Sequence, residues 1–217
     1  MKRTPGVVLL ADLSHHNGEV DFEKMKADGI DGVICKASDG ASYKDATFVA
    51  NIKGARDEGL LTFAYHFYRP LNRLEDQIRN FLSQVALVGG PLGYALDVEP
   101  SPHSVSGVDE WTMLTPQKVQ EAVDGWMEAV QDKMRVIGFI YTDAPFANEH
   151  LQSVALGYYH LWLARYIKIL PKAWQNYIMW QFTKKAVIDG VEFPCDLNRF
   201  EGTVEELSAY MAVDFKS

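Results

Sequence analysis

Residues 93–100 read Gly-Tyr-Ala-Leu-Asp-Val-Glu-Pro, a short apolar run that ends in two carboxylates and a proline. A run of this length between glycine and proline predicts a buried β-strand. Because side chains alternate along a strand, Asp97 and Glu99 should point to the same side, with Val98 opposite. The stretch therefore predicts a buried strand whose carboxyl end carries an acidic pair.

Seven runs of the same kind flank this strand, and amphipathic segments separate the earlier ones. This alternation is typical of βα units around a parallel sheet. Only about a dozen residues separate each of the last three runs, so we expect loops or hairpins there in place of helical crossovers. These features predict an α/β fold, a modified TIM-like barrel whose final third lacks its helices. The predicted strands cover residues 7–13, 32–37, 61–67, 93–98, 135–141, 159–165, 177–182 and 195–200.

The segments between the early strands have recognisable helix ends. Asp21, Thr47 and Thr115 are residue types that favour the N-cap of a helix, and Pro116 suits a first helical turn. We predict helices over residues 21–29, 47–59, 72–88 and 115–134, and a final helix that begins at the capping box of residues 203–206.

Length and composition predict one folded domain over residues 1–217, without an appended wall-binding module. The net charge of −8 argues against nucleic acid as a partner, because such proteins need a basic face. No run approaches the roughly 18 to 20 apolar residues of a membrane span, so we expect no membrane insertion. The apolar run near the N-terminus is too short for a signal peptide, which predicts synthesis in the cytoplasm.

The cysteines and histidines show no metal-binding spacing, and nucleotide-binding glycine motifs are missing, so we expect no metal and no cofactor. Buried free thiols are the expected state of Cys35 and Cys195. If the first strand lies between the second and the eighth, the two cysteines stand about 9 to 10 Å apart. That separation is beyond disulfide reach.

Four acids from three predicted strands are the candidate catalytic residues. In barrels of this kind the active site lies where strands end at the carboxyl face. A single acid at a strand end more often caps a helix or pairs with arginine, but burying four without a function would cost several kcal/mol unless each were partnered. Two carboxylates in one space raise each other's pKa, which keeps one protonated to serve as an acid. The four are Asp12, Asp97, Glu99 and Asp196.

Aromatic and amide side chains occur near the same strand ends. Aromatic faces with polar tips suit a sugar ring, although each of these residues alone could equally belong to the core. Together they predict a saccharide-binding site made of Tyr65, Phe67, Tyr141, Trp162, Tyr166 and Gln181.

From about residue 10 to residue 200 the chain resembles glycoside hydrolase family 25, the Chalaropsis-type lysozymes or N-acetylmuramidases. The matching stretches, in the family's order, are ADLSHHNG, GVICKAS, FAYHFYRP, ALDVEP, GFIYT, LWLARY, MWQF and CDLNRF. The resemblance implies about five βα units followed by three strands with short connections. It departs from the family at His16, where an aromatic such as Trp often stands, and at Ser38-Asp39-Gly40, where many members have a Glu.

The resemblance also implies a reaction, the hydrolysis of the β-1,4 bond between N-acetylmuramic acid and N-acetylglucosamine in peptidoglycan. Glu99 would act as general acid and then as base, and Asp97 would orient the substrate's acetamido group or stabilise positive charge. Asp12 and Asp196 would hold this pair and tune its proton affinity. We favour attack by the substrate's own acetamido group over attack by an enzyme carboxylate or by water directly.

The expected partner is the glycan strand of bacterial peptidoglycan, cleaved at the cell wall by a monomer. The expected lack of an export signal and of a wall-binding module suggests a phage endolysin, made in the host cytoplasm and released by a separate holin-like protein. One alternative is a silent sugar-binding module on the same barrel, which would gain nothing from desolvated carboxylates. The other is a chitinase-like hydrolase, disfavoured because Leu92 and Ala95 stand where its motif places Asp.

Overall fold

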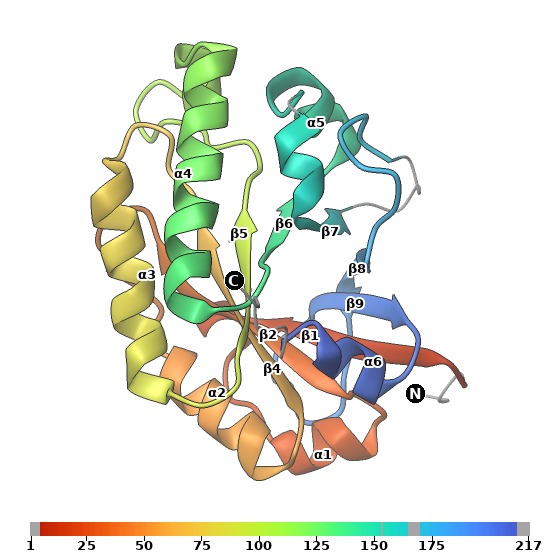
Figure 1. The fold of residues 1–217 in the computed structure, drawn as a ribbon. Coiled ribbons are helices and arrows are strands. Elements are labelled where there is room, and N and C mark those ends of the chain that lie inside the picture. The colour runs from red at the N-terminus through yellow and green to blue at the C-terminus, as the bar shows by residue number, and fades with distance from the viewer. Residues whose placement is uncertain (1–4, 153, 165–169, 212–217) are drawn as a thin grey trace.

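The computed structural model describes residues 5–152, 154–164 and 170–211, and within them the chain folds as a closed β-barrel with helices on its outside (Figure 1). This confirms the predicted α/β barrel. The strands are β1 (Val7–Leu13), β2 (Gly32–Asp39), β3 (Tyr43–Lys44), β4 (Leu61–Phe67), β5 (Gly93–Asp97), β6 (Phe139–Thr142), β7 (His160–Ala164), β8 (Met179–Ala186) and β9 (Cys195–Glu201).

Strand β1 closes the barrel, because it pairs in parallel with β2 on one side and antiparallel with β9 on the other. Apart from the short β3, neighbouring strands from β2 to β8 are parallel, whereas β9 runs antiparallel to β8. The first strand thus lies between the second and the last, which is the strand order that separates Cys35 from Cys195. Cys35 and Cys195 are indeed buried free thiols.

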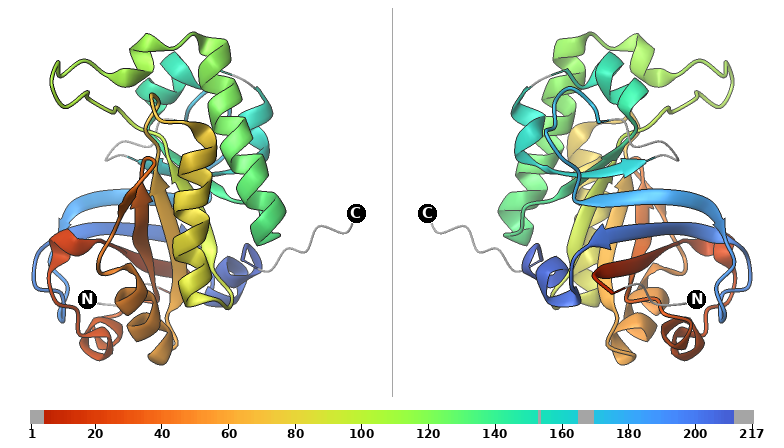
Figure 2. Two further views of the ribbon diagram at one scale, coloured as in Figure 1. Left: turned by 90° about the vertical axis from the view of Figure 1, so that its left-hand side faces the viewer. Right: turned by 90° about the vertical axis from the view of Figure 1, so that its right-hand side faces the viewer.

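Helices α1 to α5 follow β1, β3, β4, β5 and β6, which gives five βα units before the helix-poor final third. Figure 2 shows that β8, β9 and β1 form a face without covering helices. The helices are α1 (Phe22–Ala27), α2 (Phe48–Asp57), α3 (Leu74–Val88), α4 (Pro116–Met134), α5 (Ala144–His150) and α6 (Val204–Ala209), with short 3-10 turns at His15–Asn17, Glu110–Met113 and Val154–Tyr158. None of the helices in the described ranges is both long and apolar enough to cross a membrane.

One predicted strand begins later than expected, and two short elements were not predicted. The sixth strand begins at Phe139, because Arg135 takes a left-handed conformation with φ 59° and ends α4. Helix α5 was not predicted, although Asp143 caps it and a proline stands in its first turn. Strand β3, of two residues, was also missed, since it is too short to show an alternating pattern.

The inside of the barrel changes character along its axis. At the end where the parallel strands begin, inward side chains such as Leu10, Phe63, Phe139 and Phe200 form an apolar cluster that α6 covers with Leu207. Because every second residue of a strand faces inward, the same strands present polar side chains near their carboxyl ends. The outward faces of the strands pack against the helices in a separate core. The polar groups are thereby gathered at one end of the barrel.

Gly93, at the start of β5, allows this dense inner cluster to form. A Cβ atom at this position would lie 2.1 Å from Cδ1 of Phe63, which is fully buried and has no room to move. We expect Gly93→Ala to lower the free energy of unfolding by about 1–3 kcal/mol, measured by chemical denaturation. Ser104→Ala, at an exposed position, is the control. An unchanged denaturation midpoint for Gly93→Ala would contradict the close packing described here.

Candidate active site

The four predicted acids lie together at the polar end of the barrel. Asp12 stands opposite Asp196 in the pairing of β1 with β9. Asp97 is the last residue of β5, and Glu99 follows it by two positions. The charges of Asp196 and Glu99 both act on Asp12, and the charge of Glu99 acts on Asp97. Carboxylates from distant parts of the chain therefore share one small space.

Burial is the main reason that the pKa of each of these acids is raised. Asp12 and Asp97 have pKa values well above the ordinary range, first because of desolvation and then because of neighbouring carboxylates. Asp12 keeps some surface toward the mouth of the barrel, but it lies deep enough for desolvation to dominate. Burial also raises the pKa of Glu99 and of Asp196. Such a cluster holds protons at a pH where isolated carboxylates have lost them.

Lys36 stands among these acids and was not singled out from the sequence. It extends from β2, and its Nζ lies 3.3 Å from Oδ2 of Asp39. Its positive charge lowers the pKa of Asp12, Asp97 and Glu99 and so opposes the effect of burial. The available signal was a lysine inside the apolar run Val-Ile-Cys-Lys-Ala, two residues after an inward-facing isoleucine.

Asp97 carries an unused acceptor. Its side chain is only 6% exposed, and its Oδ1 atom has no hydrogen-bond partner within the described structure. An unpaired buried carboxylate oxygen is costly, since it has given up water without replacement. The position is therefore suited to accept a hydrogen bond from a bound molecule.

Aromatic side chains form one wall beside the acids. The ring of Tyr141 lies 4.5 Å from that of Trp162, and Tyr65 meets Trp162 edge to face at 6.4 Å. The Tyr141 hydroxyl donates to Oε1 of Gln181 at 2.9 Å, and Gln181 Nε2 donates to Asp12 at 3.4 Å. Burial, together with the nearby acids, raises the pKa of Tyr141 well above its ordinary value, so its hydroxyl stays protonated.

Trp162 is a support for this wall, because it is only 1% exposed. Its indole Nε1 donates to Oδ1 of Asn198 at 2.8 Å, and Asn198 Nδ2 donates to the carbonyl of Leu10 at 3.1 Å. Asn198 is fully buried and was missed from the sequence, where an asparagine in a strand gives no sign of its partner. Phe67 lies under two cations, 5.1 Å from Lys36 Nζ and 4.5 Å from the Arg69 guanidinium. Tyr166 lies outside the described residues.

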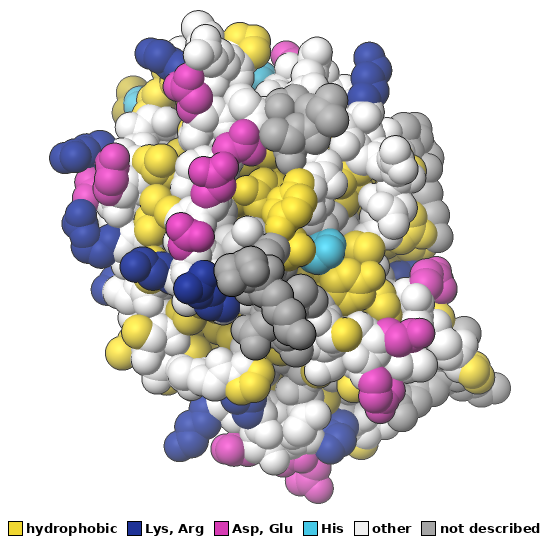
Figure 3. Space-filling view, viewed as in Figure 1, with side chains coloured by type: hydrophobic (Ala, Val, Ile, Leu, Met, Phe, Trp, Pro, Cys, Tyr) yellow, Lys and Arg dark blue, Asp and Glu magenta, His cyan; other side chains and the backbone are white. Residues whose placement is uncertain are grey.

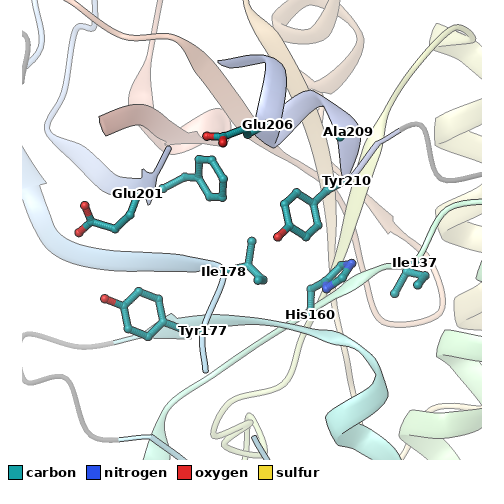
Figure 4. A pocket seen from close by; sticks show the side chains of 9 residues that line it. Ile137, His160, Tyr177, Ile178, Glu201, Glu206, Ala209 and Tyr210 are labelled. Atoms are coloured by element: carbon teal, nitrogen blue, oxygen red, sulfur yellow. The ribbon is translucent and has the colours of Figure 1, made fainter. Parts of the chain in front are cut away.

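A cavity of about 710 Å³ lies at the opposite end of the barrel (Figure 4). It opens where β7 and β8 begin, between Tyr177 and α6, with Tyr210 and His160 facing each other inside. Burial lowers the pKa of His160 to about 4, so this imidazole is neutral at pH 7. Figure 3 shows that apolar side chains gather on this face of the molecule, with acidic and basic groups mixed around them. The inner apolar cluster separates this cavity from the acids.

Comparisons with known proteins identify the family of the chain. The model of the glycosyl hydrolases family 25 matches residues 11–191. The uncharacterized protein YegX of Escherichia coli (strain K12) is 30% identical over 209 residues, which cover 92% of this chain and 72% of YegX. Lysozyme M1 of Streptomyces globisporus is 25% identical over 209 residues, covering 91% of this chain and 69% of that protein.

Solved structures show the same fold. The bacterial lysozyme of Streptomyces coelicolor superposes with a TM-score of 0.85 at 25% identity, covering 94% of this chain and 96% of that one. The family GH25 lysozyme of Aspergillus fumigatus gives 0.81 at 26% identity, covering 94% and 99%. With a family match over most of its length, the chain belongs to glycosyl hydrolases family 25 and is a glycoside hydrolase.

Proposed function

We propose that the chain is a lysozyme that hydrolyses the β-1,4 bond between N-acetylmuramic acid and N-acetylglucosamine in bacterial peptidoglycan. The observation that carries this proposal is the convergence of carboxylates with raised pKa values from β1, the end of β5 and β9 beside an aromatic wall. Relatives named as lysozymes in Streptomyces and Aspergillus species support the substrate.

In this proposal Glu99 is the general acid. Its side chain is partly exposed at the barrel mouth, while burial raises its pKa, so it holds a proton to a higher pH than an exposed glutamate and can still reach a substrate. It donates this proton to the glycosidic oxygen as the bond to the anomeric carbon breaks. The resulting Glu99 carboxylate then takes a proton from the water that completes hydrolysis.

Asp97 directs the attacking group. Its unpaired Oδ1 can accept a hydrogen bond from the N–H of the substrate's acetamido group. That bond would aim the acetamido oxygen at the anomeric carbon, where it forms a cyclic intermediate that water then opens. The charge of Asp12 raises the pKa of Asp97, and that of Asp196 raises the pKa of Glu99, so both acids keep the proton affinity of this pair high.

We propose that four of the predicted sugar-contacting residues meet the saccharide. Tyr65 and Tyr141 offer ring faces and protonated hydroxyls, and Gln181 offers an amide bridged between Tyr141 and Asp12. We propose that Phe67 contacts the same groove and that Trp162 supports it from behind. A substrate contact by Tyr166 stays a prediction.

Digestion of purified peptidoglycan tests the reaction. We expect new chain ends that mass spectrometry identifies as reducing N-acetylmuramic acid. Reducing N-acetylglucosamine would reject the bond assignment, and binding without any product would favour the silent sugar-binding module. Cleavage of chitin oligosaccharides in preference to peptidoglycan would favour the chitinase-like alternative.

The configuration of the product tests the acetamido route. Two successive displacements at the anomeric carbon retain its configuration, so NMR of the fresh digest should show the β-anomer first. Initial appearance of the α-anomer would reject this route while leaving the bond specificity intact.

A role in phage lysis, with release by a holin-like protein and action as a monomer at the cell wall, stays a prediction from the sequence. Sedimentation of the purified chain tests the monomer. Expression inside a bacterium, with and without a membrane-permeabilising protein, tests the release: lysis should require both.

A further inference from the structure

Asp39 joins two cations beside the acid cluster. Arg69 Nε lies 2.7 Å from Asp39 Oδ1, and Arg69 Nη2 lies 3.0 Å from Oδ2. Lys36 Nζ lies 3.3 Å from the same Oδ2. The Asp39 side chain is 16% exposed, so these pairs are shielded from water far more than a surface ion pair. One carboxylate thus fixes the positions of a lysine and an arginine.

An irregularity in β2 brings Asp39 to the same side as Lys36. Lys36 is paired with Tyr65, and the register then shifts so that Ser38 pairs with His66 and Asp39 with Phe67. Tyr65 and Phe67 both face the barrel interior, whereas His66 is buried on the helix side against Trp126. A bulge of this kind redirects side chains, and here it turns a residue three positions after Lys36 back toward it.

Arg69 is held in place from both sides. Gln77 of α3 accepts from the backbone N–H of Arg69 at 2.9 Å and donates to its carbonyl at 3.0 Å. The guanidinium Nη1 donates to Oγ of Ser101 at 3.1 Å, and Ser101 donates to Glu110 at 3.3 Å. Ser101 and Gln77 are both fully buried. Arg69 therefore ties Asp39 to the segment that directly follows Glu99.

Lys36 faces the acids without touching them. Among the described residues its ion pair within 4.0 Å is with Asp39, although its charge acts on Asp12, Asp97 and Glu99. The aromatic rings of Tyr43, Tyr65 and Phe67 lie 5.1 to 5.9 Å from its Nζ. Other charges that act on Glu99 are those of Asp196, Asp143 and Arg69.

We propose that Asp39, fixed by Arg69, is a positioning residue that holds Lys36 away from Glu99 and Asp97, so that the lysine balances their charge from a distance. The proposal rests on the proposed acid role of Glu99. A lysine side chain is flexible, and its attraction to a carboxylate is strongest in direct contact. Without Asp39, Lys36 would pair with the acids and hold Glu99 in its ionised form, which has no proton to donate.

The alkaline limb of kcat/KM against pH reports this effect, because it follows the pKa of the general acid. Asp39→Asn removes an anion and frees a cation, and both changes favour ionised Glu99. We expect the limb to move about one unit toward acid pH, with about a tenfold loss of rate above it. Asp39→Glu, which keeps the carboxylate, should restore the limb close to its original position.

Lys36→Met should shift the alkaline limb in the opposite direction. Loss of the cation should move the alkaline limb toward higher pH by a similar amount, because Lys36 lowers the pKa of Glu99. In the double variant Asp39→Asn with Lys36→Met, the acid shift should largely disappear, since there is no lysine left to release. An undiminished acid shift in the double variant would overturn the proposal, as would an Asp39→Asn variant that is slower without any movement of the limb.

Asp76→Asn is the matched control, because Asp76 also pairs with an arginine but does so on the outer surface of α3. It should leave the profile unchanged. Carbon-13 NMR titration of the glutamate carboxyls gives a readout independent of turnover: the Glu99 midpoint should fall in Asp39→Asn and rise in Lys36→Met. If the unmodified protein fails to cleave peptidoglycan, the proposed function fails, and this titration alone decides on Asp39.

Discussion

Replacing Glu99 with Gln should lower the rate of peptidoglycan cleavage by about 10² to 10⁴-fold, the contribution typical of a positioned general acid. Glutamine preserves the shape of the side chain but has no proton to transfer to the leaving oxygen. The loss should be largest below the alkaline limb, where Glu99 is protonated in the original protein, and should shrink above it, where the original Glu99 is itself ionised. Release of soluble fragments from purified cell wall measures it.

The same variant should be more stable than the original protein at neutral pH. Burial raises the pKa of Glu99, so this group stabilises the fold when protonated at low pH and loses that contribution as the pH rises through its folded pKa. Glutamine does not ionise, so the variant does not lose this stability as the pH rises. A lower activity with a higher denaturation midpoint is expected of a catalytic group that is buried at a cost to stability. The gain should be about 1.4 kcal/mol per unit of pKa shift.

Glu128→Gln, on the exposed face of α4, is the charge-matched control and should alter neither property. An active Glu99→Gln enzyme would remove Glu99 from the role of acid. An inactive variant that is also less stable at all pH values would point to misfolding, and circular dichroism would show it.

The meeting of the acids was predictable because it follows from periodicity. The alternation of β5, continued two residues past its end at Asp97, puts Glu99 on the same side, and barrel closure puts the carboxyl ends of parallel strands together. Asp196 joins them for another reason: β9 runs antiparallel, so its first residues meet the last residues of β1. The sequence showed short connections near the end of the chain, which favoured this reversal without determining it.

The polar network around the acids was not predictable, because it depends on register. Lys36 could have been placed facing inward, because it stands two residues after the inward-facing Ile34. The turn of Asp39 toward it is decided by the irregularity in β2 after Lys36, which leaves no mark in the residue pattern. The bond from Trp162 to Asn198 joins residues 36 positions apart on β7 and β9, two strands that are separated by β8 in the sheet. Helix α5 is different, since a cap residue and a proline marked it in the same way as α4.

Replacing Asp97 with Asn should have the next largest effect, a loss of about 10²-fold in kcat. A misplaced attacking group typically lowers the rate by about this factor. The carboxylate of Asp97 would accept a hydrogen bond from the substrate N–H. Asparagine can instead turn its own N–H₂ toward that N–H, and two donors repel each other. Binding of product saccharides, measured by calorimetry, should change much less than kcat. Equal losses in both would mean that Asp97 serves binding and does not orient the reaction.

The pH dependence of the stability of Asp97→Asn gives a second, independent test. Desolvation is the largest cause of the raised pKa of Asp97, followed by the charge of Glu99. The protonated acid therefore stabilises the fold below the unfolded pKa, and this contribution disappears as the pH rises through the folded value, by about 1.4 kcal/mol per unit of pKa shift. The variant should match the original protein near pH 4 and exceed its stability at pH 8, as denaturation with urea would measure. The opposite result would be a variant whose stability relative to the original protein is lower at pH 8 than at pH 4. It would mean that the surroundings stabilise ionised Asp97, so that the attraction of Lys36 outweighs the desolvation caused by burial.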